Sequence, residues 1–330
     1  MVWPLFHWRR PATLYLHFPC FDGIVSAVLV SLFLEKSRGW RFKRIEPVNY
    51  GLKKTWLDTS LPERSVVVDF LYHPHAEFWA DHHPTTFLTE QVKADFEQRR
   101  GAFRIYDKQS GSCALLLWRN VGETFRGDRR LEEMVHWAEK IDSAAYDSVE
   151  EAFSSVHPAL ILSRSLAVDA DHQYCTFLVN RLRRTSLQEV ARAEAVQTRF
   201  GRAQDLGWLG LERVRQTVRL EGDVAVFEAN GEGALINRYS AYYFYPKAHY
   251  SIGVTRTEHS VVVTSMRNPW LDFESLNLGE FMREFGGGGH QRVGSVVLGK
   301  ERGVEAHGIV ERLLEKLKSV PEKSVAMEVK

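Results

Sequence analysis

The sequence predicts an α/β protein: an N-terminal doubly wound, mostly parallel sheet with helices on both faces, a helical linker, and a smaller C-terminal α+β domain. In the first part, short runs of β-branched residues alternate with helical patterns. A middle stretch rich in Leu, Ala, Arg and Glu has no strand signal, and strand-like runs return after it. We place the two domains at residues 1–148 and 212–320, the helical bridge at 149–211, and a tail at 321–330.

The N-terminal domain begins with a strand, a turn and a helix, which together form one βα unit. The strand is ATLYLHF (12–18), the turn is PCFDG, and the helix is IVSAVLVSLFLEK (24–36). The continuous run VVV at 66–68 is typical of a strand buried on both faces, as in a parallel sheet. Further strands are predicted at 41–50, 65–70 and 77–83, and helices at 110–122 and 129–144.

The C-terminal domain has a different texture, with long alternating or β-branched runs. Both secondary-structure types are present without regular alternation, which favours an α+β arrangement. Strands are predicted at 217–229, within 242–267 and at 294–299, and helices at 274–285 and 303–318.

Composition limits the partners and the compartment. A net charge of +1 argues against a protein that coats long nucleic acid, so short substrates are favoured. Three cysteines without a CxxC pair suit a reducing cytoplasm. The longest apolar run, GIVSAVLVSLFL, is too short to cross a bilayer. We therefore expect a cytoplasmic protein that does not bind membranes, and the sequence leaves a homodimer open.

Acids, imidazoles and one thiol gather where the predicted strands end, with one more acid after a helix. In an open parallel sheet, ligands bind outside the carboxyl ends of the strands. Several carboxylates converge only if a cation offsets their repulsion, and carboxylate mixed with imidazole suits manganese or a similar ion. The residues are His17, Cys20, Asp22, Asp69, Asp81, His82, His83 and Asp142.

The segment WADHHP (79–84) places two imidazoles beside an acid. Adjacent residues on a strand point to opposite faces, so one metal cannot easily take both imidazoles. Each acid also has an ordinary explanation: Asp22 with Gly23 as a turn and helix start, Asp69 as the first polar residue of a loop, Asp142 as a solvated helix end. What favours a reaction site is that all of them fall at strand ends or in loops, on the face where a doubly wound sheet binds its ligands.

Four segments, in this order and spacing, resemble the N-terminal motifs of the DHH phosphoesterase superfamily. They are HFPCFDGIVSA (17–27), VVVDF (66–70), ADHHPTT (80–86) and AEKIDSAAYD (138–147). Near the C-terminus, FGGGGHQRVGS (285–295) resembles the glycine-rich signature of the DHH-associated domain, and VVVTSMRN (261–268) resembles the strand before it. Members of the superfamily include RecJ-like exonucleases, nanoRNases, cyclic dinucleotide phosphodiesterases, and relatives that act on pyrophosphate or polyphosphate.

The resemblance implies a role for each matching residue. His17 and Asp22 would bind metal from the first motif, and Asp69 would be a catalytic carboxylate that bridges two ions. Asp81 and His82 would also be ligands, with His83 a catalytic residue near the scissile phosphate, although which imidazole binds metal stays open. Asp142 would complete the coordination of the second ion. Many members carry Asp where this chain has Cys20, which is a further candidate ligand of softer character.

In the C-terminal domain the resemblance implies substrate binding. Glycine backbone can approach a phosphate closely, while Arg and His offer donors to its oxygens. The implied residues are Arg267, Gly287, Gly288, Gly289 and His290, and Arg292 could contribute or be a surface charge.

The sequence as a whole predicts a metal-dependent phosphoesterase. We expect it to hydrolyse phosphodiester bonds of short oligonucleotides or of linear or cyclic dinucleotides by attack of a metal-bound hydroxide. Two Mn²⁺ ions are the expected cofactor, with Mg²⁺ as the alternative. Two other interpretations stay open: a polyphosphate or small phosphate-ester hydrolase, and a nucleotide-binding protein with weakened catalysis.

Overall fold

The computed structural model describes residues 10–318 and divides into two compact units. The first unit contains residues up to 145 together with Ser155–Arg202, and the second contains Tyr146–Ser154 and the chain from Ala203 onward. Each unit has its own sheet and its own hydrophobic core. None of the helices in the described range combines the length and apolar character that a membrane span requires.

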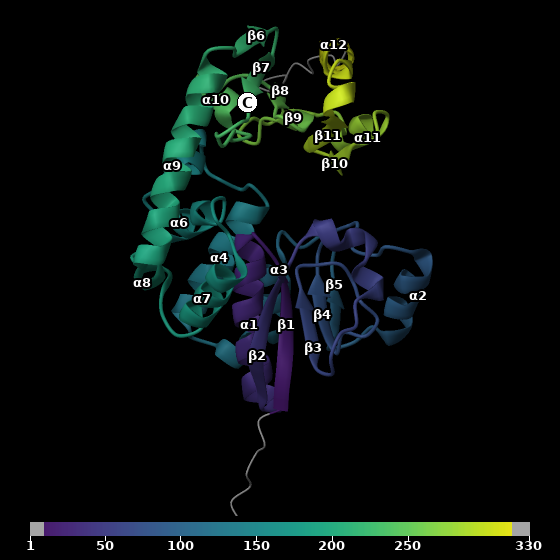
Figure 1. The fold of residues 1–330 in the computed structure, drawn as a ribbon, viewed down its shortest axis with the longest axis vertical. Coiled ribbons are helices and arrows are strands. Elements are labelled where there is room, and N and C mark those ends of the chain that lie inside the picture. Colours follow the sequence, from purple (N-terminus) through teal and green to yellow (C-terminus); the bar gives the residue numbers. More distant parts are fainter. Residues whose placement is uncertain (1–9, 319–330) are drawn as a thin grey trace, which may run out of the picture. The chain divides into compact units, whose positions relative to one another are not determined.

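The first unit is built on a five-stranded sheet in the order β2-β1-β3-β4-β5 (Figure 1). Every neighbouring pair is parallel. Because strands β2 and β3 lie on either side of β1, the strand order reverses there, and this is the topological switch point where ligands bind in doubly wound folds. The strands are β1 (Arg10–His17), β2 (Trp40–Val48), β3 (Ser65–Val68), β4 (Phe78–Asp81) and β5 (Arg104–Tyr106).

The run VVV in β3 shows how both faces of this sheet are covered. Val66 and Val68 pack into the larger core, whereas Val67 packs into a second cluster on the opposite face. Alternate residues of a strand point to opposite faces, so a continuous apolar run needs two covered faces. The doubly wound prediction is confirmed.

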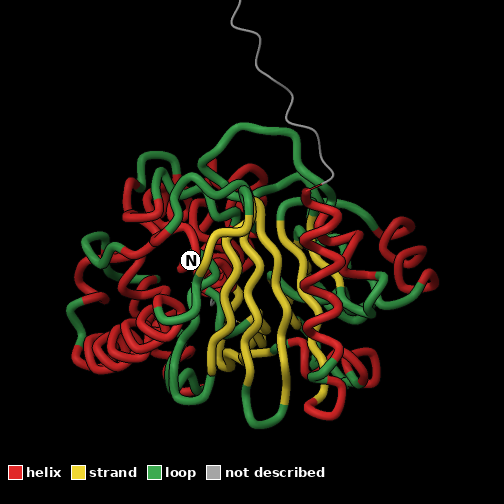
Figure 2. Tube along the Cα trace, turned by 90° about the horizontal axis from the view of Figure 1, so that it is seen from above, coloured by secondary structure: helices red, strands yellow, loops and turns green. Residues whose placement is uncertain are grey.

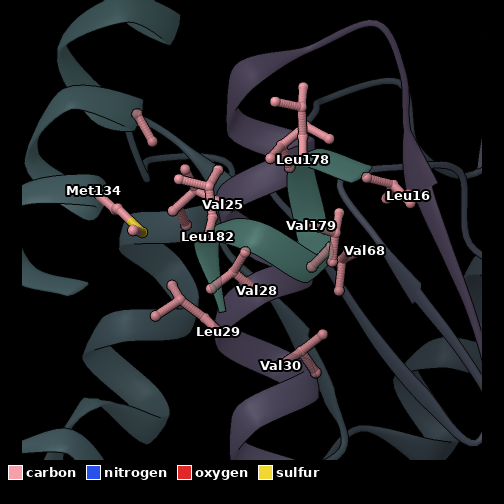
Figure 3. Packing of buried hydrophobic residues seen from close by; sticks show 14 of the residues in the cluster. Leu16, Val25, Val28, Leu29, Val30, Val68, Met134, Leu178, Val179 and Leu182 are labelled. Carbon is pink, nitrogen blue, oxygen red and sulfur yellow. The ribbon is translucent and has the colours of Figure 1, made fainter. Parts of the chain in front are cut away.

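One helix, α1 (Phe21–Arg38), lies at the centre of the larger core. Its buried side chains pack with strand and helix residues from distant parts of the chain, among them Val68 and Leu178 (Figure 3). It ends at Gly39, whose φ of 66° is the left-handed conformation that closes many helices. Other helices of this unit are α2 (Glu90–Arg99), α3 (Cys113–Val121), α4 (Arg129–Asp142), α6 (Pro158–Ser165), α7 (His172–Leu182) and α8 (Leu187–Ala191).

The sequence predicted four of the five strands and did not predict β5 or α2. Strand β5 has only three residues, and α2 is a polar helix that buries only Val92 and Phe96. The short length of β5 and the weak amphipathicity of α2 leave little periodic signal in either segment. All five strands of this unit come before α3 in the chain, and only helices follow them. Figure 2 colours helices red and strands yellow along the trace.

The predicted bridge at 149–211 is helical, with α5 (Val149–Phe153) at its start and α9 (Glu194–Arg215) at its end. Its residues are divided between the units: Ser155–Arg202 belongs to the first unit, and the rest to the second. Helices α6, α7 and α8 pack into the core of the first unit, because their apolar faces are buried there.

The second unit contains a six-stranded mixed sheet in the order β10-β11-β9-β8-β7-β6. Strands β7 and β8 are parallel, and the other pairs are antiparallel. The strands are β6 (Arg219–Glu221), β7 (Val224–Asn230), β8 (Tyr250–Arg256), β9 (Ser260–Arg267), β10 (Gly288–His290) and β11 (Val293–Gly299); the helices are α10 (Ser240–Phe244), α11 (Leu278–Arg283) and α12 (Glu305–Lys318).

Residues 242–244 lie in the short helix α10, although their aromatic composition favours a strand. Tyr242 is fully buried and its hydroxyl donates to the carbonyl of Met266 at 2.6 Å. This tertiary contact outweighs the local β propensity. The predicted tail at 321–330 lies outside the described residues.

A carboxylate and imidazole cluster at the edge of the first sheet

The candidate site lies at the carboxyl ends of β1, β3 and β4, on either side of the switch point. His17 is the last residue of β1, Asp69 follows β3 directly, and Asp81 ends β4. Parallel strands bring their carboxyl ends to one edge, so these three segments converge although they are distant in sequence. Helix α1 contributes Cys20 and Asp22 at its start, and α4 contributes Asp142 at its end.

Asp69 is the most unusual residue of the cluster. It is 1% exposed, and neither carboxylate oxygen has a hydrogen-bond partner in the described part of the protein. Burial, and then the carboxylates of Asp22, Asp142 and Asp81, raise its pKa well above the usual range. Its backbone has a φ of 57°, a strained conformation for a residue other than glycine. A buried acid without a hydrogen-bond partner is costly, and a cation bound by its oxygens would offset that cost.

His82 has one ring nitrogen bound to the backbone and the other directed at carboxylates. Nδ1 lies 3.1 Å from the carbonyl oxygen of Ser110, which can only accept, so Nδ1 carries the proton in the neutral ring. In that tautomer the lone pair is on Nε2, which lies 3.3 Å from Asp142 Oδ2 and 3.7 Å from Asp69 Oδ1. A backbone carbonyl that fixes the tautomer in this way is typical of metal-binding histidines.

Asp81 and His83 form a direct pair. Asp81 Oδ1 accepts from the Nδ1 of His83 at 2.8 Å and from the backbone N–H of His82 at 2.8 Å, while Oδ2 is buried without a partner in the described chain. Burial alone would lower the pKa of His83, but the hydrogen bond to Asp81 and the nearby carboxylates outweigh it and raise the pKa. The two imidazoles therefore differ: His82 points into the acids, and His83 is held by one of them.

Asp22 combines a structural contact with its place in the cluster. Its two oxygens accept the backbone N–H groups of Cys113 and Ala114, at 2.7 and 2.8 Å, at the start of α3. A carboxylate at a helix N-terminus is stabilised by the helix dipole. Oδ2 also lies 3.8 Å from Nε2 of His82. Asp22 thus joins α1 to α3 while it faces the centre of the site.

His17 and Cys20 lie on the other side of Asp69. His17 Nδ1 is 3.4 Å from Asp69 Oδ2, and burial followed by the neighbouring His83 lowers the pKa of His17 to about 4. The ring is therefore neutral at ordinary pH and keeps a lone pair. Helix α1 can approach because residue 23 is glycine: a Cβ there would lie 2.1 Å from the carbonyl oxygen of His17.

Three overlapping sets of side chains have donor atoms close enough to share a cation, within 4.8 Å of one another. Asp69 belongs to two of the sets and His82 also belongs to two. The unpartnered buried atoms include both oxygens of Asp69, Nδ1 of His17 and Nε2 of His82. These are ligand atoms without protein partners in the described range, so the residues present fit divalent cations. The sets are Asp69, Asp81, His82 and His83; His17, Cys20 and Asp69; and Asp22, His82 and Asp142.

The structure thus brings together the seven residues predicted as metal ligands and His83, which was predicted as a catalytic residue. The sequence did not reveal two other contributors. The carbonyl of Ser110 orients His82, and no side-chain pattern marks a backbone acceptor. The ring of Tyr50 lies 5.0 Å from the ring of His17, and a single aromatic after a strand carries no specific signal.

In the second unit, Arg267 is buried and makes hydrogen bonds to the protein backbone. The residue is 7% exposed, its guanidinium donates to the carbonyls of Asn268 (3.0 Å) and Phe273 (2.7 Å), and it lies 4.2 Å above the Phe273 ring. Burial and the neighbouring Arg292 lower its pKa. These contacts fasten the loop after β9, which leaves fewer N–H groups for a ligand.

The glycine-rich segment is shaped by backbone packing. A Cβ at Gly287 would lie 2.2 Å from the carbonyl of Ser295, and one at Gly289 would lie 2.2 Å from that of Val293. Gly289 also has a φ of 147°, which side chains rarely adopt. At Gly288 a Cβ would meet nothing within 4 Å. The side chain of His290, the last residue of β10, lies outside what the structure describes.

Fold and site together define a class: a doubly wound α/β protein whose sheet edge carries clustered carboxylate and imidazole groups that could hold a divalent cation. No protein-family model and no curated protein sequence matches the chain.

Among solved structures, the chain is similar to the pGpG-specific phosphodiesterase PggH from Vibrio cholerae, with 19% identity over 93% of this chain and 99% of that one, and a TM-score of 0.70. It is also similar to the DHH domain of a protein assigned to a family of ribosomal proteins, with 14% identity, 93% and 87% coverage, and a TM-score of 0.52. RecJ from Thermus thermophilus in complex with Mn²⁺ matches at 13% identity, 93% and 52% coverage, and a TM-score of 0.47. The first two of these similarities show that the chain has the fold of DHH-domain proteins, as the resemblance predicted.

Proposed function

We propose that this protein is a metal-dependent phosphodiesterase that hydrolyses short oligonucleotides or linear or cyclic dinucleotides. Asp69 is the observation that carries the proposal. A buried carboxylate with two unpartnered oxygens, shared by two sets of potential ligands, is unfavourable without a cation. Two cations that share one carboxylate are the usual apparatus for displacement at phosphorus.

In this proposal Asp69 would offer ligand oxygens to each of two ions. Its Oδ2 faces the side of His17 and Cys20, and its Oδ1 faces the side of His82 and His83. Asp142 joins Asp22 and His82 in the third set, and Asp81 belongs with the His83 side. Carboxylate and imidazole together suit Mn²⁺, with Mg²⁺ as the alternative. The bound ions would supply Lewis acidity, lowering the pKa of a water molecule and offsetting charge on the phosphoryl oxygens.

The proposed role of His83 follows from its pairing with Asp81. With Nδ1 donating to the carboxylate, Nε2 is the nitrogen available to exchange a proton with the substrate. An imidazole held by a carboxylate in this way can pass a proton to a leaving oxygen. His82, whose Nδ1 is bound to the Ser110 carbonyl, is the imidazole we assign to the metal.

Two features support a short nucleotide substrate. The net charge of +1 gives no general attraction to long nucleic acid. The fold is shared over nearly the whole chain with a protein described as a pGpG-specific phosphodiesterase. We further propose that the second unit resembles the DHH-associated domain and binds substrate through the glycine-rich segment, where Gly288 has open space beside its backbone.

Cys20 favours a second candidate, a nucleotide-binding protein with weakened catalysis. Its thiol stands beside His17 and Asp69 in one ligand set. Burial and the neighbouring carboxylates raise the pKa of the thiol, and a protonated thiol is a poor ligand for hard cations. One metal position would then be weak, and the protein would bind nucleotide without efficient turnover.

The test is hydrolysis by purified protein of pApA, pGpG, cyclic dinucleotides, short RNA and polyphosphate, with EDTA or with added MnCl₂, and with products separated by chromatography. We expect metal-dependent release of mononucleotides from the dinucleotides. Preferential release of phosphate from polyphosphate would favour the inorganic substrate, and nucleotide binding without products would favour the binding protein.

A further inference from the structure

The aromatic side chain of Tyr50 borders the cluster at a position that the metal-site assignment leaves unused. It begins a short 3-10 helix, Tyr50–Lys54, directly after β2. Its ring centroid lies 5.0 Å from that of His17, 5.4 Å from that of Phe70 and 6.1 Å from that of His83. Tyr50 therefore contacts imidazoles from two different strand ends at once.

The backbone around Tyr50 is held in place. The side chain of Asn49 caps the 3-10 helix by accepting the N–H of Gly51 at 2.9 Å. Phe70, whose ring packs against Tyr50, is itself fully buried and contacts Trp56 with ring centroids 4.9 Å apart. A ring supported from below on buried aromatics has a defined direction, which a binding residue needs.

The phenol of Tyr50 is accessible and has no hydrogen-bond partner among the described residues. The residue is 37% exposed. Two other tyrosines of this unit have such a partner: the hydroxyl of Tyr72 donates to Asp95 at 2.7 Å, and that of Tyr106 donates to the carbonyl of His83 at 3.3 Å. An unpaired hydroxyl beside a cluster of charged groups is free to meet a ligand.

The Tyr50 hydroxyl is a hydrogen-bond donor at a site where a bound phosphate would need one. The Tyr50 ring lies against His17 and His83, which both belong to the proposed ligand sets, so Tyr50 borders the acids of the cluster. A phenol, whose ordinary pKa is near 10, keeps its proton at neutral pH. Ionised carboxylates can only accept hydrogen bonds, whereas phosphoryl oxygens need donors.

We propose that the Tyr50 hydroxyl donates a hydrogen bond to a phosphoryl oxygen of the bound nucleotide, next to the bond that is cleaved. This inference rests on the proposed function and specifies a substrate-binding residue for it. Because the donor is neutral, it orients the phosphate without adding charge to the metal site. A hydrogen bond to a charged group of this kind corresponds to about a 10- to 100-fold change in affinity.

The test compares Tyr50→Phe with the unmodified protein on pApA, with Mn²⁺ present. We expect KM to rise about 10- to 100-fold, because the variant keeps the ring and loses only the hydroxyl. The affinity for AMP, measured as a competitive inhibitor, should fall by a similar factor. The affinity for adenosine, which has no phosphate and inhibits more weakly, should not change. Tyr15→Phe is the matched control, since the Tyr15 ring packs against Trp56 with centroids 6.0 Å apart, and it should behave like the unmodified protein.

Calorimetric titration of each variant with MnCl₂ separates a contact to substrate from a contact to His17. Unchanged Mn²⁺ affinity in Tyr50→Phe supports the proposal, and an equal loss of Mn²⁺ affinity overturns it. An unchanged KM in Tyr50→Phe also overturns it. So does an equal loss of affinity for AMP and for adenosine in Tyr50→Leu, since the ring would then be stacking on the base. If the unmodified protein neither cleaves pApA nor binds AMP, the proposed function itself fails, and this inference fails with it.

Discussion

Asp69→Asn should stabilise the metal-free protein while removing its response to metal. Burying an ionised carboxylate without a partner costs several kcal/mol, whereas a buried unpaired amide costs about 1–3 kcal/mol. Asp69 is 1% exposed and both of its oxygens lack partners in the described chain, so the full difference applies. We expect the free energy of unfolding of Asp69→Asn to exceed that of the unmodified protein by about 2 kcal/mol at pH 7.5 in EDTA. For a unit of this size this corresponds to a rise of roughly 4–8 °C in Tm.

The pH dependence of this gain follows from the raised pKa of Asp69. The unfolded chain releases this proton near pH 4, but the folded protein holds it to higher pH. Stability associated with the group is therefore fully present below about pH 4 and is lost as the pH rises through the folded pKa. The advantage of Asp69→Asn should accordingly be absent below pH 4 and appear as the pH increases.

Manganese should reverse the order of stability. A ligand at about 100 times its Kd stabilises the unmodified protein by about 2.7 kcal/mol, which is roughly 5–11 °C in Tm. The variant lacks the shared carboxylate and should respond weakly. The assay is differential scanning fluorimetry across pH 3.5–8, with calorimetry as a check. The control is Asp58→Asn, at an exposed position, whose free energy of unfolding should stay within about 0.5 kcal/mol of that of the unmodified protein. A lower Tm for Asp69→Asn in EDTA, together with an undiminished Mn²⁺ shift, would refute the reasoning.

Three further predictions concern individual residues. Cys20→Asp should tighten Mn²⁺ binding and shift preference from Zn²⁺ toward Mn²⁺ in calorimetric titrations, and an unchanged titration would place Cys20 outside the coordination sphere. Arg267→Ala should lower the free energy of unfolding of the second unit by about 2 kcal/mol or more, since two buried hydrogen bonds are lost; chemical denaturation followed by tryptophan fluorescence would measure it, and a change in KM without a change in stability would contradict the structural role. Gly287→Ala should destabilise the same unit by more than about 1 kcal/mol because its Cβ meets backbone, whereas Gly288→Ala should fold normally, and equal Tm values for the two would contradict the packing argument.

The edge of the first sheet could be predicted from the sequence for a physical reason. Each of His17, Asp69 and Asp81 ends or directly follows a β-branched or apolar run, and parallel strands bring such ends together whatever lies between them. Convergence was therefore predictable without any contact being known. The double role of Asp22, which also caps α3, was not predictable because its partners Cys113 and Ala114 are 91 and 92 residues away.

Other features depend on tertiary contacts that leave no local pattern. Arg267 resembles a free donor at a strand end, and only the folded loop shows its guanidinium bound to the carbonyl of Phe273. The sequence of helix α10 favours a strand because it is rich in Tyr and Phe, until the burial of Tyr242 is known. Strand β5 is too short for its period to be recognised.

The most direct test of the proposed site is the rate of pApA hydrolysis by metal-free protein as MnCl₂ is titrated in. We predict no detectable cleavage in EDTA, restoration by Mn²⁺, and almost no restoration in Asp69→Ala, because both proposed ions lose their common ligand. Cleavage that continues undiminished in the chelated protein, or that returns equally in Asp69→Ala, would contradict the claim that this cluster is a metal-dependent phosphodiesterase site.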